Sequence, residues 1–183
     1  MEKLEAFRTS DTVNAVSEFG EFYTDNFYGN VFTGTYGMNG YADIDEKLTE
    51  LSRKYGLSYA KKKSKGNALY KDAEVYDNGA WNAEFVIDRW NSKVRIHYIP
   101  KDALYTAWVP PLPMEEYRRI WEYETKDGVK LLCYSEGPSV LYGGGALLET
   151  EKAYIFMPFG GTIPQDLQAA ADQIDWAEIA KEG

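Results

Sequence analysis

The sequence contains one histidine and one cysteine, which limits the chemistry that the chain can perform. A Ser-His-Asp or Cys-His mechanism, or a metal site built from histidine, has only His97 as a centre. A predicted hairpin closed at residues 91–92 places Glu84, Asp88 and Arg95 on the same sheet face as His97. We interpret this group as an ordinary outer face in which Arg95 pairs with Asp88, and the alternative is an acid-base or metal site.

Cys133 lies inside a predicted strand and has no adjacent basic residue. A reactive cysteine needs a positively charged environment that favours the thiolate. Cys133 is therefore predicted to be an inert, partly buried thiol. A single cysteine also excludes an intrachain disulfide, which leaves the redox compartment open.

Two glycine-rich stretches lack the spacing of nucleotide-binding motifs. Residues 143–145 are not followed by Lys-Ser or Lys-Thr, and residues 160–162 do not match a dinucleotide fingerprint. Both stretches are interpreted as turns. The sequence therefore predicts no cofactor, and it predicts no metal site.

The charge balance argues against polyanionic partners. Lys and Arg total 20 against 29 Asp and Glu, a net charge of -9 that opposes contact with nucleic acid and anionic membranes. The basic cluster at residues 61–65 is interpreted as a solvated loop or a lysine-protected edge strand, and the alternative is a contact with nucleic acid or acidic lipid. No signal peptide or membrane span is evident. We expect a soluble cytoplasmic protein or the extracytoplasmic part of an anchored one.

The C-terminal third, residues 117–180, gives the clearest structural signals. Strand-like runs at 119–125 and 129–135 flank Asp127-Gly128, and such a two-residue turn is a strong hairpin signal. Further strands are predicted at residues 138–142, 146–148 and 153–157. Together these runs predict an antiparallel meander.

A two-residue turn fixes the register of the C-terminal hairpin. It pairs Trp121 with Tyr134 and Tyr123 with Leu132, so these four side chains share one buried aromatic face. The opposite face carries two glutamates, Glu122 and Glu124. Truncating Trp121 to alanine is expected to cost about 3–5 kcal/mol if it belongs to the core.

Two hairpins are predicted in the middle of the chain. Asn78-Gly79 closes the first, with Tyr76 opposite Trp81. In the second, closed at residues 91–92, Ile87 pairs with Ile96 and Phe85 with Tyr98.

Three helices complete the predicted elements. One begins near residue 10 and ends at Gly29, and one covers residues 43–55 with a left-handed C-cap at Gly56. The third covers residues 162–180 after a capping box formed by Thr162 and Gln165. Its apolar stripe is Leu167, Ala170, Ala171, Ile174 and Ala177. This helix is expected to lie on the aromatic face.

Residues 100–117 contain four of the seven prolines and are excluded from a central strand or a helix interior. We interpret this segment as a crossover whose Trp108 fills the core. The alternative is a lid that places Tyr105 and Trp108 over Trp121 and Tyr134, forming an apolar ligand-binding slot.

The C-terminal third resembles part of a bacterial domain family of unknown function that is common in Gram-positive bacteria. The similar stretches are Tyr123–Val129, Ala153–Met157, a glycine pair, and residues 163–174. The fold of that family is similar to the lipoprotein-carrier and sigma-regulator group. Its members often follow one transmembrane helix, and it offers no catalytic residues to carry over. The resemblance implies an extracytoplasmic sensor or ligand-binding module.

The sequence therefore predicts a single α+β domain, with a curved antiparallel β-sheet, N-terminal helices and a C-terminal helix packed on the sheet. Residues 1–57 are expected to be mainly helical, 58–159 to form the sheet, and 162–180 the last helix. The predicted function is a non-enzymatic binding or sensing module for a small apolar ligand or a protein partner, with a membrane anchor outside the chain. The alternative is a cytoplasmic enzyme or immunity-type protein that uses an aromatic-lined cleft.

Overall fold

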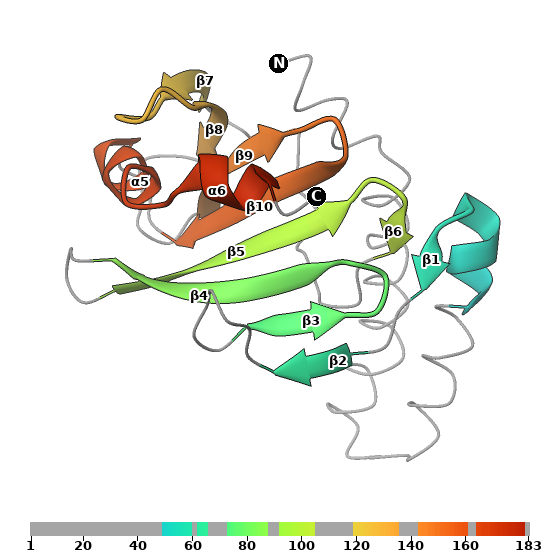
Figure 1. Cartoon of the computed structure of the whole chain (residues 1–183). Coiled ribbons are helices and arrows are strands. Elements are labelled where there is room, and N and C mark those ends of the chain that lie inside the picture. Colours follow the sequence, from blue (N-terminus) through green and yellow to red (C-terminus); the bar gives the residue numbers. More distant parts are fainter. Residues whose placement is uncertain are drawn as a thin grey trace, which may run out of the picture.

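The chain has an α+β fold in which helices pack on a curved antiparallel sheet (Figure 1). The computed structural model describes residues 49–59, 62–65, 73–87, 92–104, 119–135, 143–160 and 164–181. The predicted helix at residues 10–29, the predicted strand at 138–142, Thr162, and residues 105–117 of the Pro-rich segment, with Tyr105 and Trp108, lie outside the described residues.

Within the described ranges, the main sheet has eight strands in the order β2-β3-β4-β5-β10-β9-β8-β7, and every neighbouring pair is antiparallel. The strands of its first half are β2 Lys62–Lys65, β3 Glu74–Tyr76, β4 Trp81–Ile87 and β5 Ser92–Pro100. Those of its second half are β7 Arg119–Glu124, β8 Lys130–Ser135, β9 Gly143–Glu149 and β10 Ala153–Gly160. A separate parallel pair joins β1 Ser58–Tyr59 to β6 Ala103–Leu104. The lysine-rich β2 is an edge strand of the described sheet, as its composition predicts.

The C-terminal hairpin closes through three residues, so its predicted register is wrong by one position. The Thr125 N–H donates to the Val129 carbonyl at 2.9 Å, and the Gly128 N–H donates to the Thr125 carbonyl at 2.8 Å. Gly128 has a φ of 81°, which suits the last residue of a three-residue loop. Trp121 consequently lies opposite Cys133, and Tyr134 projects from the other face.

The first middle hairpin repeats this geometry. The Tyr76 N–H donates to the Ala80 carbonyl at 2.9 Å, and Gly79 has a φ of 86°. Trp81 therefore lies opposite Val75, and the predicted pairing with Tyr76 is wrong for the same reason.

The register between β4 and β5 also differs from the predicted one. Ile87 pairs with Ser92 and Phe85 with Val94, which displaces the predicted pairs by four positions. Because four is an even number, every side chain stays on its predicted face. The apolar face carries Trp81, Ala83, Phe85 and Ile87 next to Val94, Ile96 and Tyr98.

Residues 143–145 belong to β9, so the predicted bend there is wrong. A Cβ atom at Gly145 would lie 2.7 Å from the Tyr134 hydroxyl, 2.8 Å from the Met157 carbonyl oxygen and 3.0 Å from the Phe156 ring. The rings of Tyr134 and Phe156 are parallel, with centroids 6.1 Å apart. Gly145 is therefore required by close packing inside the sheet, not by a turn.

Residues 49–55 are helical and end at the predicted cap. Gly56 has a φ of 67°, and the Leu57 N–H donates to the Ser52 carbonyl at 2.9 Å, which is the bond of a Schellman motif. The cap is confirmed, and Leu51 of this helix is buried as its spacing predicts.

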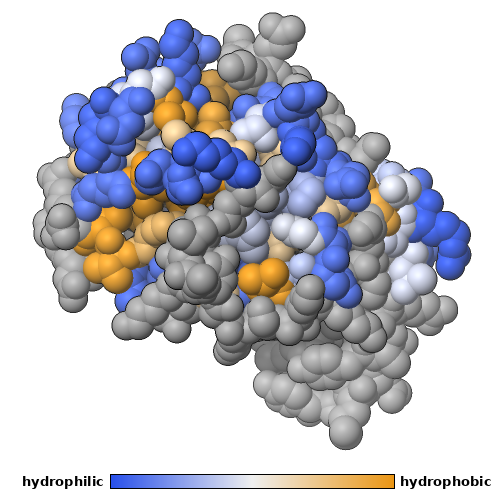
Figure 2. All heavy atoms as spheres, in the orientation of Figure 1, coloured by the Kyte–Doolittle hydropathy of each residue, from blue (hydrophilic) through white to orange (hydrophobic). Residues whose placement is uncertain are grey.

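The predicted C-terminal helix is two helices, α5 Pro164–Ala171 and α6 Trp176–Lys181. The Asp175 carboxylate accepts a hydrogen bond from the Glu178 N–H at 2.9 Å, so Asp175 caps a new helix. Both helices cover one face of the sheet, and hydrophilic residues dominate their outward surface (Figures 1 and 2). Restarting the helix changes its phase, so Ala177 is exposed while Trp176 and Ile179 are buried.

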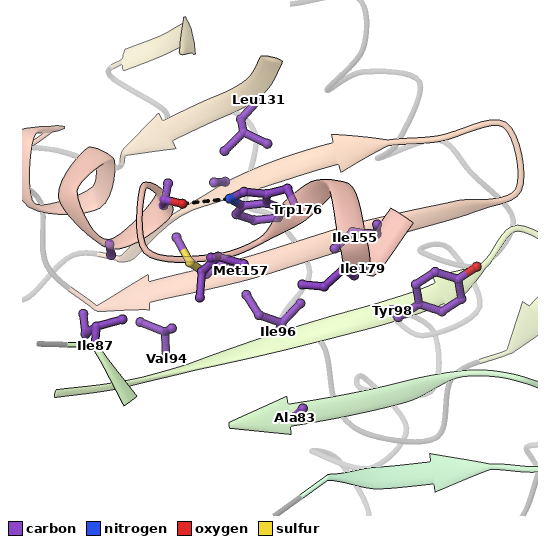
Figure 3. Close-up of a cluster of buried hydrophobic side chains, with 14 of the residues drawn as sticks. Ala83, Ile87, Val94, Ile96, Tyr98, Leu131, Ile155, Met157, Trp176 and Ile179 are labelled. Atoms are coloured by element: carbon purple, nitrogen blue, oxygen red, sulfur yellow. Dashed lines mark hydrogen bonds between the residues drawn. The ribbon is translucent and has the colours of Figure 1, made fainter. Parts of the chain in front are cut away.

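Trp176 is the largest fully buried side chain among the described residues and is 1% exposed. Its indole lies between the helices and the sheet, and its Nε1–H donates to the Ala171 carbonyl at 2.9 Å (Figure 3). Ala171 ends α5, where carbonyl groups lack partners within the helix. The Ala171 carbonyl also accepts from the Ile174 N–H at 3.2 Å, so the Trp176 side chain fills the core and adds a second hydrogen bond at the end of α5.

Trp176→Ala is expected to lower the free energy of unfolding by about 3–5 kcal/mol, because it empties a fully buried site. Trp121→Ala is expected to cost less, because Trp121 is only half-buried against the same core. Urea denaturation of both variants measures the difference. Equal costs would show that Trp176 does not have the central role assigned to it.

Gly145→Ala is expected to cost about 1–3 kcal/mol, the range for overpacking a dense site. The contact with the Tyr134 hydroxyl can relax by side-chain movement, whereas the contact with the Met157 carbonyl requires the backbone to shift. Urea denaturation in the parent and in a Tyr134→Phe background separates the two contacts. An unchanged midpoint for Gly145→Ala would contradict the close packing.

Candidate functional site

Three turns meet at one end of the main sheet (Figure 1). They are the β3–β4 turn at residues 77–80, the β5–β6 turn at 101–102, and the β9–β10 turn at 150–152. They meet because β5 lies between β4 and β10 in the sheet, with Pro100 opposite Ala153.

Hydrogen bonds join these turns into one frame. The Lys101 N–H donates to the Lys152 carbonyl at 2.9 Å, which links the β5–β6 turn to the β9–β10 turn. The Asn78 side-chain amide donates to the Leu104 carbonyl at 2.9 Å, which links the β3–β4 turn to β6. Within the β9–β10 turn, the Thr150 hydroxyl oxygen accepts from the Ala153 N–H at 2.9 Å. The turns are thus held in a defined arrangement without a ligand.

The frame borders an open hollow of about 430 Å³. Its lining residues are Gly79, Tyr98, Pro100, Lys101, Asp102, Glu151 and Lys152. The Tyr98 ring stacks on Trp81, with ring centroids 5.5 Å apart and planes 1° apart. The Tyr98 hydroxyl points away from the other core side chains (Figure 3). We refer to this space as the sheet-end hollow.

One of the charged residues that line the hollow, Lys101, forms an ion pair with a residue outside the lining. The Lys101 ammonium lies 2.8 Å from a Glu149 carboxylate oxygen and 5.1 Å from the centre of the Tyr154 ring. Its charge is therefore largely balanced by groups outside the lining. Asp102 and Glu151 are exposed at the rim, together with Lys152.

A second polar cluster crosses β3, β4 and β5 on the face opposite α5 and α6. The Asn82 side chain is buried, receives a hydrogen bond from Arg95, and donates to a Glu74 carboxylate oxygen at 3.2 Å. Glu84 lies 3.5 Å from Arg95 and also accepts from Lys93. The hydrogen bond from Lys93 helps to hold the pKa of Glu84 below its ordinary value.

His97 lies at the buried end of this cluster and is 7% exposed. Its predicted neighbours Glu84 and Arg95 do share its face, whereas Asp88 lies outside the described residues. Burial, helped by the positive charge of Arg95 and opposed by Glu74, lowers the pKa of His97 to about 4. His97 is consequently neutral at pH 7, and Arg95 pairs with Glu84.

Cys133 is fully buried in the core, which confirms the predicted burial of the thiol. Burial raises the pKa of the thiol to about 12, so the reactive thiolate is scarce at neutral pH.

Of the four residues predicted to form an aromatic slot, the structure describes two, Trp121 and Tyr134, and these two do not come together. Trp121 lies on the face covered by the helices, and Tyr134 lies on the opposite face, stacked on Phe156. The two side chains project from opposite faces of the sheet, because Trp121 pairs with Cys133 and not with Tyr134. They therefore cannot line the same slot. Tyr105 and Trp108 lie outside the described residues, so their role remains a prediction.

Other classes of site were also sought. Among the described residues, no group of three or more His, Cys, Asp or Glu side chains is arranged to hold a metal ion. Within the same ranges, no helix has the length and apolar character needed to cross a membrane.

Sequence reasoning found the turn signals but missed the hollow. The sequence predicts a turn at Asn78-Gly79, and the predicted strands at residues 146–148 and 153–157 imply a short connection between them. What brings the turn and this connection together is the pairing of β5 with β10, which joins segments far apart in the sequence. A turn signal carries no information about that pairing.

Comparison of this chain with protein-family models, curated proteins and solved structures gives no match. The resemblance of the C-terminal third to a Gram-positive extracytoplasmic family therefore stays a prediction.

The low pKa of His97 predicts a loss of stability in mild acid. The unfolded chain binds a proton near pH 6.5, whereas the folded protein does so only near pH 4. Stability due to this group is complete above pH 6.5 and falls by roughly 3 kcal/mol as the pH drops to 4. Urea denaturation at a series of pH values measures the slope. The His97→Gln protein lacks this titration, so a parent and variant with equal slopes would contradict the assignment.

Proposed function

We propose that this protein is a non-enzymatic binding module whose ligand site is the sheet-end hollow. The observation that carries the proposal is the frame of three hydrogen-bonded turns around an open space. Binding sites of small molecules are usually concave and largely formed before the ligand arrives. A frame that needs little ordering also reduces the entropic cost of binding.

The states of His97 and Cys133 support a binding role over a catalytic one. A general base works best with a pKa near the working pH, and the pKa of His97 is far below it. A cysteine nucleophile needs a lowered pKa, and that of Cys133 is raised to about 12. Both side chains are also buried away from the sheet-end hollow in the described structure.

The proposal is tested by titrating isotope-labelled protein with a mixed library of small amines, carboxylic acids, sugars and nucleosides. A bound compound is expected to shift the backbone amide signals of residues 77–80, 101–102 and 150–152. It should also change the fluorescence of Trp81, because Trp81 stacks on Tyr98 in the lining.

His97→Gln and Cys133→Ser serve as matched controls. Both should leave the dissociation constant within about twofold of the parent, a difference of only about 0.4 kcal/mol. Loss of binding in a folded His97→Gln or Cys133→Ser protein would place function at those residues instead. If no compound shifts the three turns, the proposed site is wrong.

A further inference from the structure

The sheet-end hollow and the ion pair beside it together carry one excess negative charge. The two lysines and two acids of the lining balance, but Lys101 is also paired with Glu149, which adds a third carboxylate. The remaining ionic groups of the lining are two carboxylates, Asp102 and Glu151, and the single ammonium of Lys152. A positively charged ligand group is therefore favoured at the rim.

The long-range field acts in the same direction. The whole chain has a net charge of -9, and such a charge raises the local concentration of cations near the surface. The hollow is open to solvent beside three turns, so a cation that is attracted by the net negative charge can reach it.

The floor of the hollow suits an apolar body. Pro100 presents a ring without a backbone N–H, and Tyr98 presents a phenol whose oxygen can accept a hydrogen bond. The volume of about 430 Å³ is enough for a ligand of modest size. The lining thus combines acceptors and negative charge at the rim with apolar surface below.

We infer that the sheet-end hollow selects a small organic cation, in which a primary ammonium group is carried on a compact apolar body. This inference rests on the proposed binding function and names its ligand class. The ammonium group would lie between Asp102 and Glu151, and the apolar body would cover Pro100 and the edge of Tyr98.

The probes are cyclohexylammonium and its neutral analogue cyclohexanol, with cyclohexanecarboxylate as the anionic analogue. Each is titrated at low salt while the amide signals of the three turns are followed. The amine is expected to bind at least about tenfold more tightly than either analogue, and added salt should reduce that preference.

Two double variants with the same change of net charge separate a local from a global effect. Asp102→Asn with Glu151→Gln should weaken amine binding at least about tenfold. Glu122→Gln with Glu124→Gln, two exposed positions on the edge strand β7, should weaken it less than about twofold.

Equal loss in both double variants would show that only the overall charge matters and would overturn the inference. Binding of cyclohexanol or the carboxylate as tightly as the amine would overturn the ligand class while leaving the hollow as a binding site. If neither these probes nor the mixed library shift the three turns, the binding function itself fails.

Discussion

The described structure depends on covering one face of its eight-stranded sheet, and Trp176 is the largest fully buried side chain beneath this cover. An isolated helix of eight residues such as α5 is not stable in water, so its stability comes from packing. The Trp176 indole packs into the sheet and donates to the last residue of α5, while Asp175 starts α6. The reversal between the two helices is thus fixed by the same side chain that fills the core.

The sequence predicts the faces of the sheet better than the pairing of its strands. Alternation along one strand places Trp121 with Tyr123, whichever residues lie opposite. Glu84 shares a face with His97 on the neighbouring strand because the register error between β4 and β5 is an even number of positions. The pairing depends on whether glycine is the second or the third residue of a loop. At Gly79 and Gly128 it is the third, a choice that Asn-Gly and Asp-Gly do not determine by themselves.

Other features follow from tertiary contacts that local signals do not contain. Gly145 is a strand residue because Tyr134, Phe156 and Met157 occupy the space beside it. Asp175 and Glu178 provide a capping signal in the sequence, but the continuous apolar stripe suggests one unbroken helix. The candidate site forms only because β5 pairs with β10, and the turn residues in the sequence do not predict that pairing.

The strand order also has a consequence for the folding reaction. Strands β2 to β5 form one meander and β7 to β10 another, and each is built from neighbours in the sequence. The two last strands, β5 and β10, join the meanders at the centre of the sheet. Each half can form through short loop closures, and a single long-range step then unites them. We therefore expect the docking of the two halves to be the slow event in folding, and the sheet-end hollow to form only with it.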